Sequence, residues 1–148
     1  MITTHSEPGH SEETVPRLGH VELELPARGD LLFLARMTAA AVASRAEFGY
    51  EQVEDVRLAL DELCLALLEK TPEDSRIALT FGWTEDSIEI TASTDHCGSR
   101  TSESSAEVPK PNELAERILD ALVDSHGFEV VGEKTTSWLR MKRAETAE

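Results

Sequence analysis

The sequence predicts an α+β domain: a two-layer sandwich in which a mostly antiparallel, mixed sheet carries three helices on one face. Two observations support this fold class. First, strand and helix patterns follow one another along the 148 residues in the order strand, helix, helix, hairpin, loop, helix, hairpin. Second, residues 52–70 place apolar side chains at three- and four-residue steps, as one side of a long amphipathic helix does.

The first elements follow from local patterns. Residues 1–18 are polar and without periodicity, and we expect a mobile arm there. Residues 20–26 alternate apolar and polar side chains and end in a proline, which predicts a half-buried strand. Asp30 is the predicted N-cap of a helix over residues 31–46, whose alanine-rich middle would allow another helix to approach closely.

The second helix, predicted over residues 51–70, has two apolar sides. Its core stripe consists of Val56, Leu60 and Leu67, with Cys64 at its edge. The other side carries Leu58 and Leu65 together with Glu62, a pattern that suggests a covering subunit or ligand.

The next part of the chain reads as a hairpin and a long loop. Residues 76–83 and 87–93 alternate apolar and polar side chains, so they predict two strands of a sheet with one side on helices and the other in water. Residues 94–111 contain almost no apolar side chain, and we expect a flexible loop that is long for a compact domain.

A third helix and a second hairpin complete the predicted domain, which ends in a polar tail over residues 144–148. The helix is expected over residues 113–125 and is stopped by His126-Gly127, with strands over 128–131 and 136–141. Its predicted apolar stripe is Leu114, Ile118, Ala121 and Leu122.

The net charge of −15 excludes more functions than it identifies. Such a surface repels phosphate backbones and anionic lipids, so direct nucleic-acid or membrane binding is not expected, whereas a basic protein partner is compatible. No apolar run is long enough to cross a bilayer, and the first residues lack the features of a signal peptide. A cytoplasmic protein with two free thiols is therefore expected.

Few side chains suggest chemistry by themselves. Asp61 and Glu62 are adjacent, and because neighbouring helical residues diverge by about 100°, they cannot form a carboxylate dyad. The contiguous residues 95–98 include metal-capable side chains, but their spacing does not match a zinc site, and no metal is predicted. Arg36 lies among apolar neighbours on the first helix, where it either extends to water or is presented to a partner.

The element order and the segment RLALDELCLALLEK, residues 57–70, resemble the anti-sigma-factor serine kinases of the RsbW type, in the GHKL (histidine-kinase-like ATPase) superfamily. Within it, residues 60–64 look like the start of the helical N-box of that family. The resemblance implies a GHKL-like anti-sigma-factor domain over residues 19–143, with the loop 94–111 in place of the ATP lid.

The family resemblance also implies partners and an activity. Members bind a sigma factor and hold it off RNA polymerase, commonly as dimers. Many use ATP and Mg²⁺ to phosphorylate a serine on a small antagonist protein. The implied partners are thus an alternative sigma factor, a STAS-type anti-sigma-factor antagonist and a second copy of the chain.

Carried over residue by residue, the resemblance is uneven. Glu62 matches the N-box general base, and Arg36 matches an arginine presented to protein partners. Asp95 is the candidate for the adenine-binding aspartate, followed by Gly98 one position later than the family pattern. Ala66 stands where an asparagine would bind Mg²⁺, and Cys97 stands where the pattern has glycine. Residues 99–111, where a second glycine-rich box is expected, contain no glycine.

These departures favour a protein that sequesters an alternative sigma factor by protein–protein binding and is released by the antagonist, with nucleotide binding weakened or absent. Two alternatives remain open. One is an active serine/threonine kinase that uses Glu62 as base and Asp95 for adenine. The other is a non-enzymatic adaptor for a different partner, because fold does not fix function.

Overall fold

The computed structural model describes residues 17–69, 71–72, 74–95 and 112–144. The predicted arm 1–18, loop 94–111 and tail 144–148 therefore lie, apart from their inner ends, outside the described residues, as do Cys97 and Gly98. The elements are β1 (Gly19–Pro26), the short 3₁₀ helix η1 (Gly29–Leu31), α1 (Leu32–Arg45), α2 (Tyr50–Glu69), β2 (Arg76–Trp83), β3 (Ser87–Asp95), α3 (Glu113–Leu122), β4 (Ser125–Val131) and β5 (Lys134–Lys142).

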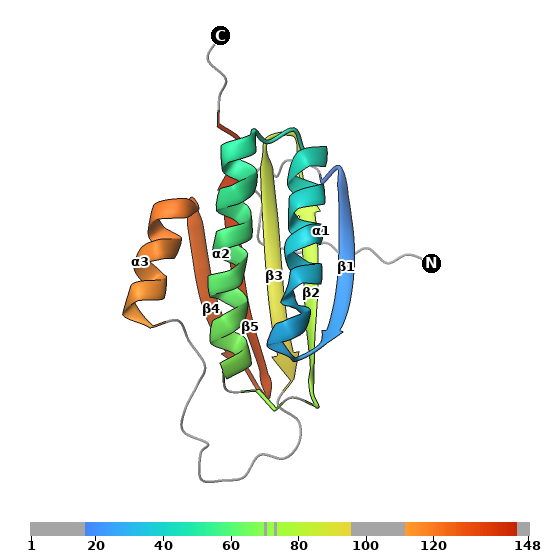
Figure 1. Ribbon diagram of the computed structural model, residues 1–148, viewed down its shortest axis with the longest axis vertical. Coiled ribbons are helices and arrows are strands. Elements are labelled where there is room, and N and C mark those ends of the chain that lie inside the picture. The colour runs from blue at the N-terminus through green and yellow to red at the C-terminus, as the bar shows by residue number, and fades with distance from the viewer. Residues whose placement is uncertain (1–16, 70, 73, 96–111, 145–148) are drawn as a thin grey trace, which may run out of the picture.

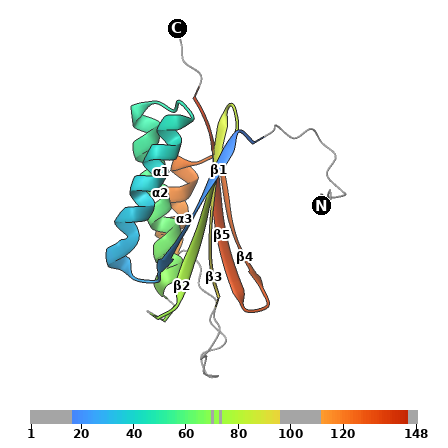
Figure 2. The same ribbon diagram turned by 90° about the vertical axis from the view of Figure 1, so that its right-hand side faces the viewer.

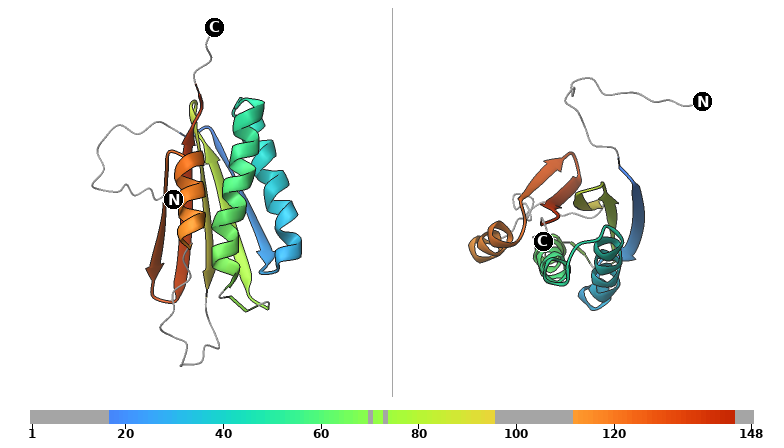
Figure 3. Two further views of the ribbon diagram at one scale, coloured as in Figure 1. Left: turned by 60° about the vertical axis from the view of Figure 1, so that its left-hand side comes forward. Right: turned by 90° about the horizontal axis from the view of Figure 1, so that it is seen from above.

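The five strands form one sheet in the order β1-β2-β3-β5-β4, and every neighbouring pair is antiparallel. All three α-helices lie on one face of this sheet, with α2 between α1 and α3, while no helix among the described residues covers the other face (Figures 1, 2 and 3). The predicted two-layer α+β sandwich is thus confirmed and is consistent with a GHKL-like sandwich.

The core forms where α2 lies on the middle of the sheet. The strand alternation turns Ile77, Leu79 and Phe81 of β2 toward the helices, where they are at most 1% exposed. The predicted stripe of α2 is confirmed, because Val56, Leu60 and Leu67 are also no more than 1% exposed. Burial of such side chains is the main stabilising contribution to a domain of this size.

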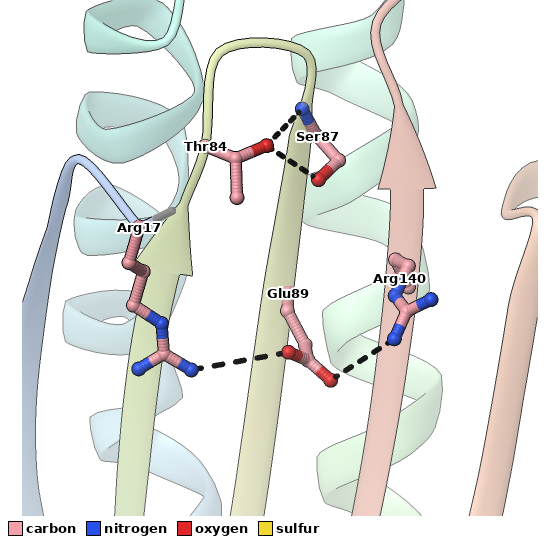
Figure 4. A network of polar contacts seen from close by, with 5 residues as sticks. All are labelled: Arg17, Thr84, Ser87, Glu89 and Arg140. Atoms are coloured by element: carbon pink, nitrogen blue, oxygen red, sulfur yellow. Dashed lines mark hydrogen bonds and ion pairs between the residues drawn. The ribbon is translucent and has the colours of Figure 1, made fainter. Parts of the chain in front are cut away.

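The uncovered face of the sheet is polar, as the alternation predicts. Near its centre, Glu89 on β3 lies between Arg17 and Arg140, with nitrogen–oxygen distances of 4.0 and 3.8 Å (Figure 4). The β2–β3 turn is held by Thr84, whose hydroxyl accepts hydrogen bonds from the backbone N–H groups of Asp86 and Ser87 (3.2 and 3.1 Å). Exposed ion pairs of this kind contribute little to stability.

The predicted N-cap at Asp30 is wrong. Asp30 lies inside η1, and α1 follows Leu31, which makes no side-chain cap. The Asp30 carboxylate instead accepts two hydrogen bonds from the Arg28 guanidinium, at 2.9 and 3.1 Å. The charged neighbour two residues earlier competes successfully for the oxygen atoms that a cap would need.

The predicted end of the third helix is also wrong. α3 ends at Leu122, and β4 already begins at Ser125, so His126 and Gly127 belong to a strand. Gly127 is opposite Trp138 on β5, and a Cβ there would lie only 2.7 Å from the indole ring. This glycine therefore makes room for a cross-strand tryptophan and does not stop a helix.

The buried side of α3 is turned by one residue from the predicted stripe. Ala115 and Leu119 are the buried residues, whereas Ile118 and Leu122 are half-buried and Leu114 is 66% exposed. Because α3 lies at the margin of the helical layer (Figure 1), only a narrow side of it meets α2 and β4.

Candidate functional site

Arg36 and Asp61 meet between the first two helices. The alanines on the inner side of α1, Ala35, Ala39 and Ala43, are fully buried and allow α2 to pack closely. The Arg36 Nη1 atom donates a 2.8 Å hydrogen bond to Asp61 Oδ1, and the two side chains are 33% and 29% exposed. The arginine predicted to face a partner is therefore held by a carboxylate of its own chain.

Apolar side chains surround this ion pair. On α1, Phe33 lies three residues before Arg36 and shares its side of the helix, whereas Met37 follows Arg36 directly and lies at the edge of that side; their exposed fractions are 45% and 61%. Leu58 and Leu65 lie three residues before and four after Asp61 on α2, and they are 48% and 46% exposed. We call Arg36, Asp61 and these four side chains the Arg36 patch. A cluster of exposed large apolar side chains with an arginine at its centre has the composition of an interface centre.

Glu62 lies on a different side of α2 from Asp61. One residue later, it is rotated by about 100° from that carboxylate, so that it lies between Leu58 and Leu65 on one side and Ala59 and Ala66 on the other. Its side chain is half-buried and has no hydrogen bond or ion pair within the described part of the chain. The separation of Asp61 from Glu62, predicted from helix geometry, is what the structure shows.

Asp95 is not brought to Glu62. It is exposed at the end of β3, where the strand alternation directs it to the uncovered side of the sheet, opposite to the buried Thr94. There it borders a hollow of about 470 Å³ together with Arg76, Ser93 and Lys134. Gly98, the other predicted adenine-end residue, lies outside the described residues.

The sequence interpretation missed two buried hydroxyl groups. Thr94 on β3 and Ser137 on β5 face the helices, are 2% and 0% exposed, and have no partner for their hydroxyl oxygens among the described residues. The strand register places Thr94 opposite Thr135 and Ala92 opposite Ser137, so the two hydroxyl-bearing residues are diagonal neighbours. Polar residues at helix-facing positions of both strands would have indicated this feature in the sequence.

Thr94 and Ser137 offer polar groups for which the described residues provide no partner. Unpaired buried hydroxyls can donate to and accept from a polar ligand such as a purine edge. For the metal end, the family resemblance would put a magnesium ligand at position 66, where this chain has an alanine and so no oxygen atom on the side chain. No group of three His, Cys, Asp or Glu side chains in the described ranges could hold a metal ion. We derive no step through magnesium.

Cys64 lies beneath the Arg36 patch. It is a free cysteine and is fully buried. Burial, with a smaller effect of the nearby Asp61 carboxylate, raises the pKa of its thiol to about 12, although Arg36 acts in the opposite direction. The thiol is therefore neutral at physiological pH and packs as a small apolar group.

The comparisons with known proteins point to one kind of relative, although no family model matches the chain. Over 76 residues the chain is 33% identical to the serine-protein kinase RsbW of Bacillus cereus (strain AH187), covering 50% of this chain and 48% of that protein. The corresponding kinase of Bacillus thuringiensis subsp. konkukian (strain 97-27) matches equally, with 33% identity over 76 residues.

A third relative, the serine-protein kinase RsbW of Bacillus cereus (strain B4264), is 32% identical over 78 residues. The chain spans about half the length of the curated relatives it matches. This chain is thus similar to RsbW serine-protein kinases over half its length. In the ranges that the structure describes, no helix is both long and apolar enough to cross a membrane.

Proposed function

We propose that this protein is a cytoplasmic anti-sigma factor of the RsbW type, which sequesters an alternative sigma factor by protein–protein binding through the Arg36 patch. The patch carries the proposal, because it presents an arginine among four exposed apolar side chains on the two helices that the family resemblance selects. The similarity to RsbW proteins over half the chain supports the choice of partner class.

The patch has the physical features of a binding site. Interface energy is concentrated in a few central side chains, among which arginine is over-represented. Covering Phe33, Met37, Leu58 and Leu65, which are 45%, 61%, 48% and 46% exposed, would remove apolar side chains from water. Arg36 is already oriented by Asp61, so less side-chain freedom is lost when a partner docks.

The proposal includes the remaining expectations. Residues 19–143 form the sigma-binding domain, with 1–18 and 144–148 as appendages and 94–111 as the loop in place of an ATP lid. A STAS-type antagonist releases the sigma factor, and the working species is a homodimer. No direct contact with nucleic acid or membrane is part of the function, in keeping with the net charge of −15.

The second candidate is a serine kinase that phosphorylates the antagonist. Two observations favour it: the matched relatives are named serine-protein kinases, and the hydroxyls of Thr94 and Ser137 are buried without partners in the described part of the chain. Glu62 would be the general base. The alanine at position 66 disfavours it, because magnesium loses a ligand there. An adaptor for another partner is the third candidate.

The test is to mix the purified full chain with each sigma factor and each STAS-type protein of its source organism. Complexes are measured by gel filtration and calorimetry. We expect one alternative sigma factor to bind, and we expect Arg36→Glu and Leu65→Asp to weaken binding at least tenfold. Leu114→Asp is the matched control, because Leu114 is an exposed leucine on α3 (66%), away from the patch.

The outcomes separate the candidates. The absence of any sigma-factor complex would overturn the proposal. Heat on adding Mg-ATP, followed by phosphoserine on an antagonist, would establish the kinase instead. If Arg36→Glu bound a sigma factor as tightly as the parent does, the proposed function would stand, but the Arg36 patch would be rejected as its site.

A further inference from the structure

Charge on the uncovered face of the sheet is segregated by strand. Strand alternation directs Glu22 and Glu24 of β1 to this face, whereas β5 directs Lys134, Arg140 and Lys142 to it. In the strand order, β2 and β3 lie between β1 and β5. An acidic strand and a basic strand are therefore three strands apart, or about 14 Å at the usual strand spacing.

The uncovered face is balanced in charge, although the chain is strongly acidic. Its strands, together with Arg17 beside them, carry equal numbers of cations and anions: Arg17, Arg76, Lys134, Arg140 and Lys142 against Glu22, Glu24, Glu89, Asp95 and Glu129. On α2 and α3, by contrast, acidic residues far outnumber the two basic ones, Arg57 and Arg117. A body that docks on the sheet thus meets no excess of negative charge there.

The middle of the face is flat and uncharged. The outward positions of β2, β3 and β5 between the charged ends are Ala78, Thr80, Thr91, Ser93, Thr136 and Trp138. The ring of Trp138 lies against the backbone of β4, because a Cβ at Gly127 would be only 2.7 Å from it. An uncharged centre with an aromatic residue, inside a charged margin, has the composition of an interface and suits the packing of one sheet on another.

A second copy of the chain complements this pattern. A two-fold axis that runs parallel to the strands between β2 and β3 lays β1 of each copy on β5 of the other. The acidic strand then meets the basic strand twice. A different protein would need a basic and an acidic strand at the same spacing, whereas the second copy has them by symmetry.

The overlap is large enough for a specific contact. Four strands of each copy face each other over the length of β5, about 26 Å at the usual rise per residue. The covered area is about 500 Å² per copy and about 1,000 Å² in all, which is the lower bound for a specific interface. The acidic helices stay on the outside, where salt screens their repulsion beyond about 8 Å.

We propose that two copies of the chain pair through the uncovered faces of their sheets, with Glu22 and Glu24 of each copy facing Lys134 and Arg140 of the other. The inference rests on the homodimer in the proposed function and locates its interface. Because the Arg36 patch lies on the helical layer, it stays exposed in both copies.

The test reverses the charges of the two strands separately. One variant of the full chain carries Glu22→Lys and Glu24→Lys, and the other carries Lys134→Glu and Arg140→Glu. Each variant alone places like charges on facing strands, so its dimer should be weaker by about tenfold or more. A mixture of the two should restore the dimer, because both contacts of the mixed pair again join opposite charges. The measurement is sedimentation velocity over about 1–100 µM, where the parent should be dimeric.

Two further variants distinguish this interface from the Arg36 patch. Thr91→Arg places a charge in the centre of the face and should abolish the dimer. Leu65→Asp, on α2, should leave the dimer as it is in the parent while it weakens binding of the sigma factor. Circular dichroism checks that each variant is folded, and Glu22→Lys alone replaces the double variant of β1 if the latter is not.

Three results would overturn the proposal: a parent that stays monomeric at about 100 µM, a mixture no more dimeric than its two components, or a dimer lost in Leu65→Asp but kept in Thr91→Arg. The proposed function is tested separately by adding the sigma factor. A monomer that binds it would reject this interface and keep the sequestration, whereas a sheet-paired dimer that binds no sigma factor would keep the interface and reject the sequestration.

Discussion

Arg36 on α1 and Asp61 on α2 are joined by a 2.8 Å hydrogen bond between opposite charges, 25 positions apart in the sequence. This contact links two neighbouring helices and fixes the direction of the guanidinium group. Arg36 and Asp61 were recognised separately in the sequence, one as a partner-facing residue and the other as half of an acidic pair. The two side chains form an ion pair because the alanine-rich helix α1 packs closely on α2.

A double-mutant cycle of Arg36→Ala and Asp61→Ala should give a coupling free energy of about 1 kcal/mol. The pair is partly shielded from water, so its charges attract more strongly than those of a fully exposed pair, for which about 0.2–1 kcal/mol is usual. The measurement is urea unfolding of the parent, both single variants and the double variant.

The control cycle uses Arg28 and Asp30, whose side chains are 50% and 64% exposed. This contact is equally short but local and more exposed, and we expect a coupling of about 0.5 kcal/mol or less. Coupling between Arg36 and Asp61 that does not exceed this control would contradict a structural role for the inter-helix pair.

Two helix starts show what local sequence does and does not decide. Asp30 and Asn112 both have the residue type of an N-cap before a helical pattern. Only Asn112 acts as one, its Oδ1 accepting a 2.8 Å hydrogen bond from the Ala115 N–H. Asp30 is drawn to Arg28 instead, inside a 3₁₀ turn that the sequence pattern does not distinguish from the start of α1.

Asn112→Ala should therefore lower the free energy of unfolding by about 1 kcal/mol, because the N–H of Ala115 loses its partner. Asp30→Ala should change it by less than about 0.5 kcal/mol, since an exposed ion pair is lost and no cap. Both values come from urea unfolding at neutral pH. If Asp30→Ala lowered the free energy of unfolding more than Asn112→Ala did, the conclusion that Asn112 caps its helix and Asp30 does not would be wrong.

The alkaline stability of the protein should depend on Cys64. Its pKa is raised to about 12 in the folded state, from a value of 9.0 without burial. Above pH 9 the unfolded chain loses this proton while the folded chain keeps it, so the stability contributed by proton binding falls as pH rises from 9 to 12. The slope is about 1.4 kcal/mol per pH unit for one group.

Cys64→Ala removes that dependence. We expect a lower stability at pH 7 by about 1 kcal/mol or more, because a buried sulfur is replaced by a cavity. Between pH 9 and 11 the parent should lose stability more steeply than the variant, by about 1.4 kcal/mol per pH unit. Parallel curves in urea unfolding across this range would contradict the raised pKa.

Much of the architecture could be predicted from sequence because it depends on repeating patterns. Alternation at Ile88 and Ile90 gave the buried side of β3, and the three- and four-residue steps gave the buried side of α2. The candidate site was harder to predict from the sequence. The strand was expected to end at residue 93, so the same alternation was not carried on to Thr94 and Asp95, where it directs the threonine inward and the carboxylate outward.

The hydroxyls of Thr94 and Ser137 give the last prediction. Each is buried and has no partner among the described residues, and leaving such a group unpaired costs about 1–3 kcal/mol. Thr94→Val, which is nearly isosteric, and Ser137→Ala should therefore raise the free energy of unfolding by about 1 kcal/mol, measured by urea unfolding. Thr91→Val, on the uncovered side of the same strand, is the control and should change little.

If the two hydroxyls serve a nucleotide, both variants should also lose any heat of ATP binding that the parent shows in calorimetry. Destabilisation by Thr94→Val would mean that its hydroxyl has a partner inside the folded chain, and a role for it in binding a polar ligand would no longer be supported.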